Sequence, residues 1–193
     1  DLARECRLEA QRDDMLRGAC INGTEGRQVL HTALRAPQGQ GPHSQAVHEV
    51  LEAMLAYVEG VRARAGGAQP GDIRDVVNIG IGGSDLGPQM VVPALEAFVH
   101  PGLNFHFVSN VDGVQIGDVL RHCRPETTLF IVASKTFATQ ETLANAGAAR
   151  AWLAEVARTT AKSLIDRCLS MIYVVHEGRL QAAQASMGGG RLQ

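Results

Sequence analysis

Three hydroxyl groups and one ammonium group lie within six residues of the sequence, on Ser134, Lys135, Thr136 and Thr139. They follow an apolar run at 129–133, and a helical pattern begins near residue 140. Hydroxyl, ammonium and helix-start amide groups are donors that bind a phosphate dianion. The same hydroxyls also cap helices, with a carboxylate such as that of Glu141 in the first turn. The two uses are compatible, so this loop is the first candidate for phosphate binding.

A glycine-rich segment from Gly82 to Pro88 is the second candidate. It follows the apolar run 76–81 and precedes a helix that we expect at 89–99. Glycines such as Gly83 let the backbone approach a ligand closely, and Ser84 adds a hydroxyl. A tight turn that uses glycine only for its backbone angles explains this segment equally well when it is taken alone. Two such loops after neighbouring strands nevertheless favour phosphate binding over helix capping alone.

The sequence argues against a nucleotide cofactor. Gly80 and Gly82 begin a dinucleotide-binding fingerprint, but Asp85 stands where the third glycine is needed. No acidic residue ends the next strand at the required distance, because Asp112 comes late. The glycine-lysine loop that cradles nucleoside triphosphates is also absent from the sequence. We therefore expect no cofactor.

Histidine and cysteine spacing predicts no metal site. None of the seven histidines pairs with another histidine or a cysteine at ligand spacing, apart from the adjacent His122 and Cys123, which cannot easily face one ion. His106 lies within an apolar run, and we interpret it as a residue of the core or the sheet face. The four cysteines, at 6, 20, 123 and 168, are far apart and are expected to be reduced, structural thiols.

The elements that must position these residues alternate between short apolar runs and helical patterns. The runs are too apolar for a sheet with one exposed face, which favours parallel strands covered by helices on both sides. We expect an α/β fold, a three-layer α/β/α sandwich, with strands at 76–81, 105–108, 129–133 and 171–175. Ligands bind at the carboxyl ends of the strands in such sheets, where the two candidate loops lie.

The region before the first strand has helical patterns and no strand-like apolar runs. We expect a surface helix at 1–20, a turn and a helix start within 21–34, and an amphipathic helix at 44–64. The sequence is accordingly divided into an amino-terminal helical segment (1–65), a phosphate-binding domain (66–157) and a tail (158–193).

Charge and hydropathy restrict the partners. The chain has 193 residues and a formal net charge of -2, so no basic field is available to hold nucleic acid or an anionic membrane. Its apolar runs are far shorter than the roughly 20 residues that cross a bilayer, and no secretory leader opens the sequence. We expect a cytoplasmic protein with no nucleic-acid or membrane partner.

Four segments resemble, in order and spacing, the motifs of the glucose-6-phosphate isomerase family. They are 24–35 (TEGRQVLHTALR), 77–88 (VNIGIGGSDLGP), 107–113 (FVSNVDG) and 134–142 (SKTFATQET). The resemblance covers roughly residues 1 to 154. It implies a sugar isomerase (SIS) domain that binds the phosphate of glucose 6-phosphate or fructose 6-phosphate, and a homodimer for the full-length family.

The resemblance also implies roles for individual residues. Ser134, Lys135, Thr136 and Thr139 correspond to the phosphate ligands, and Gly83 and Ser84 to the sugar side of the pocket. Glu141 and Arg27 fall in matched motifs and are placed near the site.

The family's reaction interconverts an aldose and a ketose phosphate through an enediolate, in glycolysis and gluconeogenesis. The residues that shuttle the proton, face the enediolate and open the ring belong to segments that would follow this sequence, so no catalytic residue is assigned. We expect a partial chain that binds the phosphate with little isomerisation; the tail is either a further strand or, as we favour, a truncated end. A non-catalytic SIS module that senses sugar phosphates is the alternative, and a nicotinamide-dependent oxidoreductase is the weakest hypothesis.

Overall fold

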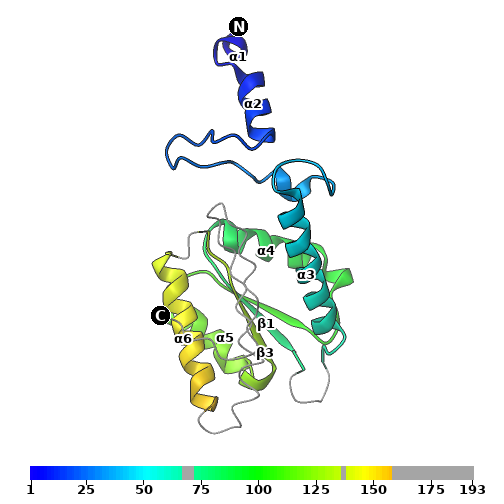
Figure 1. Cartoon of the computed structure of the whole chain (residues 1–193). Coiled ribbons are helices and arrows are strands. Elements are labelled where there is room, and N and C mark those ends of the chain that lie inside the picture. The colour runs from blue at the N-terminus through cyan, green and yellow to red at the C-terminus, as the bar shows by residue number, and fades with distance from the viewer. Residues whose placement is uncertain (67–71, 136–137, 158–193) are drawn as a thin grey trace. The chain divides into compact units, whose positions relative to one another are not determined.

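The computed structural model describes residues 1–66, 72–135 and 138–157 (Figure 1). Within these residues the chain forms two compact units, one of Asp1–Tyr57 and one that begins at Val58. The division at residues 65 and 157 drawn from the sequence stays a prediction. The strand expected at 171–175 and the tail 158–193 lie outside the described residues.

The first unit contains short helices rather than the single helix expected at 1–20. Helices α1 (Leu2–Glu5) and α2 (Leu8–Leu16) are separated at Arg7, whose φ of 51° is left-handed. No α-helix starts within 21–34. Instead the Asn22 side chain accepts hydrogen bonds from the amides of Thr24 and Glu25, both at 3.2 Å. This local bonding competes with helix formation.

The rest of this region is close to expectation. A 3₁₀ turn, η1, spans Ala33–Arg35. The long helix α3 spans Ser44–Arg62, which confirms the helix expected at 44–64. Helix α3 passes the boundary between the two units.

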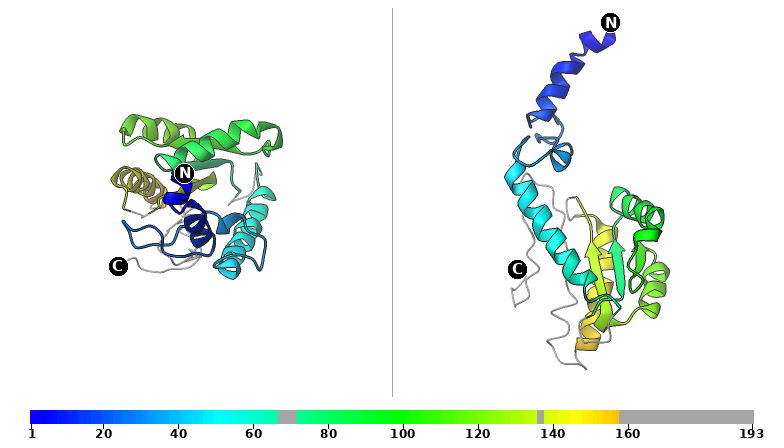
Figure 2. Two further views of the ribbon diagram at one scale, coloured as in Figure 1. Left: turned by 90° about the horizontal axis from the view of Figure 1, so that it is seen from above. Right: turned by 90° about the vertical axis from the view of Figure 1, so that its right-hand side faces the viewer.

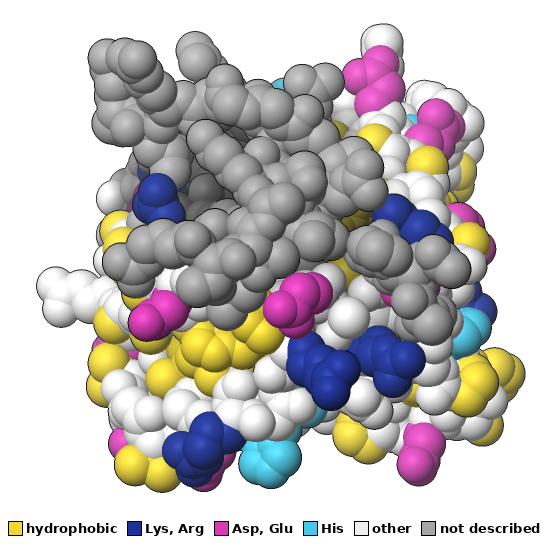
Figure 3. Space-filling model, turned by 90° about the horizontal axis from the view of Figure 1, so that it is seen from below, with side chains coloured by type: hydrophobic (Ala, Val, Ile, Leu, Met, Phe, Trp, Pro, Cys, Tyr) yellow, Lys and Arg dark blue, Asp and Glu magenta, His cyan; other side chains and the backbone are white. Residues whose placement is uncertain are grey.

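On the face drawn in Figure 3, basic and acidic side chains of the described residues are interspersed. None of the helices in the described ranges is long and apolar enough to span a membrane.

The second unit is built on three parallel strands in the order β2-β1-β3. They are β1 (Asp75–Ile79), β2 (Asn104–Val108) and β3 (Thr128–Val132), each within one or two residues of its expected position. Strand β1 is central and buried along its whole length. Ile79 lies opposite both Val108 and Val132, so the three carboxyl ends meet at one edge.

Helices cover both faces of the sheet. They are α4 (Gly83–Ala94), α5 (Gly113–His122) and α6 (Gln140–Ala157), with the 3₁₀ turns η2 (Glu96–Phe98) and η3 (Pro125–Thr127) between them. Figures 1 and 2 draw these helices around the strands, with α5 and α6 side by side in Figure 1. Asn78 of β1 bonds to α4, whereas Val77 and Ile79 pack against α5 and α6, so α4 covers the opposite face. The α/β fold with a parallel sheet flanked by helices is confirmed.

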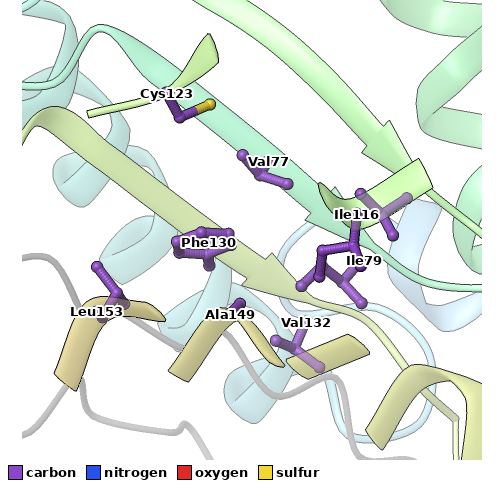
Figure 4. Close-up of a cluster of buried hydrophobic side chains, with 9 residues drawn as sticks. Val77, Ile79, Ile116, Cys123, Phe130, Val132, Ala149 and Leu153 are labelled. Atoms are coloured by element: carbon purple, nitrogen blue, oxygen red, sulfur yellow. The ribbon is translucent and has the colours of Figure 1, made fainter. Parts of the chain in front are cut away.

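The hydrophobic core lies between the sheet and the pair α5 and α6 (Figure 4). Side chains on alternate strand positions point to this face. Its members from the strands include Val77, Ile79 and Phe130, and α6 contributes Leu153, which is fully buried. The rings of Phe130 and Trp152 meet edge to face with centroids 6.1 Å apart, a favoured aromatic geometry.

Candidate functional site

The strand order creates a topological switch point at the carboxyl edge of the sheet. The chain passes from β1 to β2 on one side and then crosses to β3 on the other. Loops that leave neighbouring strands in opposite directions form a topological switch point, the usual ligand position in open parallel sheets. Here the switch point lies between the loops after β1 and β3, and these loops carry the two motifs predicted to bind phosphate.

Gly80 brings these two loops into close contact. Its amide donates to the Val108 carbonyl at 3.1 Å, and the Ala133 amide donates to the Ile79 carbonyl at 2.8 Å. A Cβ added to Gly80 would lie 2.8 Å from the Cβ and the carbonyl oxygen of Ser84 and 3.1 Å from the Ala133 oxygen. No side chain fits there. Glycine is therefore needed at this position because strand, helix start and neighbouring loop converge on it.

Helix α4 starts at Gly83, earlier than the expected start at Gln89, so the glycine-rich segment is mostly helix. Gly82 has φ 59° and ψ -125°, a backbone conformation that is essentially restricted to glycine. The amides of Ser84 and Asp85 already donate to carbonyls of the preceding turn, at 3.2 and 3.0 Å. A ligand at this helix start would consequently meet the Gly83 backbone and the Ser84 hydroxyl rather than a full set of open amides.

A side chain from β1 makes the early helix start feasible. Pro88 has no amide hydrogen, so the carbonyl of Ser84 cannot receive its helical hydrogen bond. The Asn78 side-chain amide donates to that carbonyl at 3.0 Å instead. Asn78 is buried, and its position identifies the face of the sheet that α4 covers. Sequence reasoning missed this role, although a polar residue inside an apolar strand was the available signal.

The loop after β3 gathers the predicted phosphate ligands. Ser134 is buried, and its hydroxyl lies 3.2 Å from that of Thr139, which immediately precedes α6. Lys135 is exposed between them in the sequence. Thr136 lies outside the described residues. The start and the end of this loop are thus tied by two hydroxyl groups, which leaves the Lys135 side chain on the solvent side.

The third polar loop, after β2, is fixed by side chains from two helices. The side-chain oxygen Oε1 of Gln115 accepts hydrogen bonds from the backbone amides of Ser109 and Asn110, at 3.2 and 2.9 Å. On the other side, the Asn145 side chain of α6 donates to the Asn110 carbonyl at 2.8 Å. These contacts connect the loop after β2 to α6, the helix that follows the loop after β3. Sequence reasoning identified neither Gln115 nor Asn145, because a contact between a helix and a distant loop has no local signature in the sequence.

Asp112 lies at the start of the helix that follows β2. An Asp-Gly pair is typical of an ordinary turn, whereas here α5 begins at Gly113. The Asp112 carboxylate accepts the Val114 amide at 2.9 Å and so caps this helix.

Two buried polar atoms lie in the first turns of the helices that begin at this edge. They are Oδ1 of Asp85 in α4 and the hydroxyl oxygen of Thr142 in α6, and neither has a hydrogen-bond partner among the described residues. Buried polar atoms are normally satisfied, so groups outside the described residues, water or a ligand are expected to meet them. Sequence reasoning assigned no ligand-binding role to either residue.

Glu141 and Arg27, which the family resemblance places near the site, belong to different units. Glu141 is half-buried in the first turn of α6, close in sequence to Thr139. Arg27 belongs to the first unit, where its backbone pairs with that of Asn22. Its position near the site stays a prediction.

The model of the phosphoglucose isomerase family matches residues 1–173 of this chain. The chain belongs to the phosphoglucose isomerase family. The match extends beyond residue 154, where the motifs placed the end of the resemblance, so the extent predicted from the sequence was too short. Residues 155–173 belong to the family region as well.

Members of the phosphoglucose isomerase family share much of this sequence. Glucose-6-phosphate isomerase of Leptothrix cholodnii is 65% identical over 151 residues, which are 78% of this chain and 27% of that protein. The Methylibium petroleiphilum protein of the same name is 58% identical over 165 residues, 85% of this chain and 30% of its own. The chain thus spans less than a third of the length of these relatives.

A solved structure supports the fold. A crystal structure of a glucose-6-phosphate isomerase from Chlamydia trachomatis superposes with a TM-score of 0.70 at 28% sequence identity. The superposition covers 93% of this chain and 34% of that one. The similarity includes the parallel sheet and the helices that flank it.

Proposed function

We propose that this chain supplies the sugar-phosphate-binding part of an aldose-ketose isomerase that interconverts glucose 6-phosphate and fructose 6-phosphate. The observation that carries the proposal is the packing at Gly80, which holds the start of α4 against the loop after β3 at the switch point of the sheet. Family membership supports the choice of substrate. It also supports a place in glycolysis and gluconeogenesis.

In this proposal the phosphate binds to the loop after β3. The hydroxyls of Ser134 and Thr139 and the ammonium group of Lys135 neutralise and orient the dianion, and Thr136 is the fourth ligand. The sugar extends toward Gly83 and Ser84, because α4 begins at the same edge of the sheet. Two hydroxyls already joined by a hydrogen bond lose little freedom when the phosphate arrives, which favours binding.

Isomerisation needs groups of another kind. A base must move a proton between C1 and C2, and a cation must stabilise the enediolate charge. Binding the phosphate supplies affinity and position but transfers no proton. We propose that these groups belong to the remainder of a full-length protein, so the chain alone binds its ligand and turns it over poorly or not at all.

Calorimetric titration of the 193-residue chain with glucose 6-phosphate tests the binding step. We expect saturable binding, and we expect Lys135→Met to weaken it about tenfold or more, because hydrogen bonds to charged groups contribute roughly 1.5–3 kcal/mol. Arg121→Met is the matched control. Arg121 is an exposed cation paired with Asp118 at the far end of α5, and its loss should leave affinity unchanged. Equal affinities for Lys135→Met and the parent would exclude the proposed phosphate loop.

A coupled assay that measures fructose 6-phosphate formation tests whether the chain is a complete enzyme. Both the isomerase-fragment hypothesis and the sensor hypothesis predict little or no turnover. Turnover comparable with that of an ordinary enzyme would show that the chain contains a base that we have not located. Tight binding by a stable, monomeric chain without turnover would instead favour the non-catalytic SIS sensor. The family resemblance is also our basis for proposing a homodimer and a cytoplasmic location for the full-length protein.

A further inference from the structure

Three side chains of metal-ligand type converge at the amino end of the sheet, away from the phosphate loops. They are Asp75 at the start of β1, His106 within β2 and Cys123 directly after α5. One donor atom from each lies within 4.8 Å of the others. Asp75 and His106 share a sheet face with Val77, and Figure 4 shows Cys123 at the end of the core next to Val77.

The contacts within this cluster orient the carboxylate. Nε2 of His106 donates to Oδ1 of Asp75 at 2.9 Å. The Asn104 side-chain amide donates to the same oxygen at 3.2 Å. The side chain of Asp75 is 11% exposed and that of His106 is 24% exposed. The cluster is therefore held by the protein on one side and open to water at the histidine.

We propose that Asp75, His106 and Cys123 form a binding site for a divalent zinc-type ion. A thiolate sulfur, an imidazole nitrogen and a carboxylate oxygen are the donors that zinc takes in proteins, and three protein ligands leave the fourth tetrahedral position for water. The partial exposure of His106 provides the entry path. Asn104 is a positioning residue that acts through the Asp75 carboxylate, as hydrogen-bonded partners of metal ligands commonly do.

The donor atoms lie within 4.8 Å of one another, and bonds of about 2.0–2.3 Å place the donors of a tetrahedral ion roughly 3.3–3.6 Å apart, so they must approach by up to roughly 1.2 Å. Bond lengths of about 2.0–2.2 Å to nitrogen and oxygen place these two donors roughly 3.3 Å apart around a tetrahedral ion. The present separation of Nε2 and Oδ1 is 2.9 Å. The ion replaces the proton between them: the histidine proton moves to Nδ1 through solvent, and the Cys123 thiol releases its proton as the sulfur–metal bond forms. One proton is released for each ion bound.

Sequence reasoning predicted no metal site because these residues are far apart in the sequence. The parallel pairing of β1 with β2 brings Asp75 to Asn104 and Val77 to His106, and the return of the chain after α5 adds Cys123. The ion would connect β1, β2 and the end of α5. We therefore expect it to raise the unfolding temperature of the metal-free chain.

Titration of the metal-free 193-residue chain with Co²⁺ tests the site through its absorption spectrum. We expect one equivalent to bind, with intense visible bands of a four-coordinate ion and a near-ultraviolet thiolate-to-cobalt band. Cys123→Ser should lose the thiolate band, His106→Gln should weaken binding, and Asn104→Ala should weaken it about 10- to 100-fold. The control variants Cys20→Ser and Cys168→Ser should leave the spectrum unchanged. A thiolate band that persists in Cys123→Ser would overturn the proposal.

X-ray absorption of the Zn²⁺-loaded parent chain gives an answer that does not depend on the folding of a variant. One sulfur at about 2.3 Å, with nitrogen and oxygen ligands at about 2.0–2.2 Å, is the expected first coordination sphere. A sphere without sulfur, or with two sulfurs, would contradict the proposed ligand set, as would failure to bind Zn²⁺.

Discussion

The Asn78 side chain donates a hydrogen bond at 3.0 Å to the Ser84 carbonyl, the group that Pro88 leaves without a partner inside α4. A side chain of the central strand thus completes the hydrogen bonding of the helix that begins at the candidate site. The contact fixes where the Gly83 backbone stands relative to β1.

A double-mutant cycle measures that connection. Asn78→Ala should lower the free energy of unfolding by about 1–3 kcal/mol, because it leaves a carbonyl without its partner. The same change should cost less in a Pro88→Ala background, where residue 88 regains an amide hydrogen that can bond to the Ser84 carbonyl. Chemical denaturation of the four proteins gives the coupling energy. Strictly additive costs would mean that Asn78 does not replace the missing helical bond.

Two glycine substitutions separate folding from ligand binding. Gly80→Ala places a Cβ 2.8 Å from Ser84 and should destabilise the chain by about 1–3 kcal/mol, a typical cost of overpacking. A Cβ on Gly83 meets no atom within 4 Å, so Gly83→Ala should leave the unfolding midpoint nearly unchanged while it weakens glucose 6-phosphate binding. Denaturation curves and calorimetry on both variants provide the comparison. Full affinity in a stable Gly83→Ala protein would place the sugar elsewhere.

The hydrogen bond from Asn145 to Asn110 predicts that a change in α6 alters amide hydrogen exchange in the loop after β2. Asn145 is buried in α6, and Asn145→Ala removes the bond to the loop after β2. We expect faster amide hydrogen exchange at Ser109 and Asn110, because one of the two side chains that fix this loop is lost. Exchange in β3 serves as the internal reference. Unchanged exchange in the loop would show that Gln115 alone holds it.

Alkaline pH should weaken the fold through Cys123. Burial, reinforced by the nearby carboxylate of Asp75, raises the pKa of Cys123 to about 11, while Thr128 lowers it slightly. The unfolded chain then loses this proton at a lower pH than the folded chain, so the contribution to stability is complete below the thiol's ordinary pKa. It disappears as the pH rises toward 11. The stability difference between the metal-free parent and Cys123→Ser should therefore fall over this range, and a pH-independent difference would refute the assignment.

The strands were predictable and the start of α4 was not, for physical reasons. Runs such as 129–133 are apolar because both faces of a central parallel sheet are buried, and the signal is local in the sequence. The glycines and Pro88 indicate a loop when read locally, whereas a contact from Asn78 makes the segment helical. Tertiary contacts of this kind, including those of Asn145, have no periodic signature.

The candidate site was predicted only in part. Ser134, Lys135 and Thr139 were recognisable because their donors are adjacent in the sequence, and the structure places them on one loop at the carboxyl edge. The cluster of Asp75, His106 and Cys123 was missed, because its members meet only after two strands pair and a helix returns the chain. Spacing along the sequence reveals sites on one loop or one helix, but not sites assembled from three elements.

The most direct test of the central claim is an amide chemical-shift map of the ¹⁵N-labelled chain titrated with glucose 6-phosphate. Binding at the switch point predicts saturable shifts at Gly83, Ser84, Ser134, Lys135 and Thr139, smaller shifts with inorganic phosphate, and none with glucose. Saturable shifts confined to other segments, or no shifts at all, would contradict the proposal that these two loops form the sugar-phosphate site.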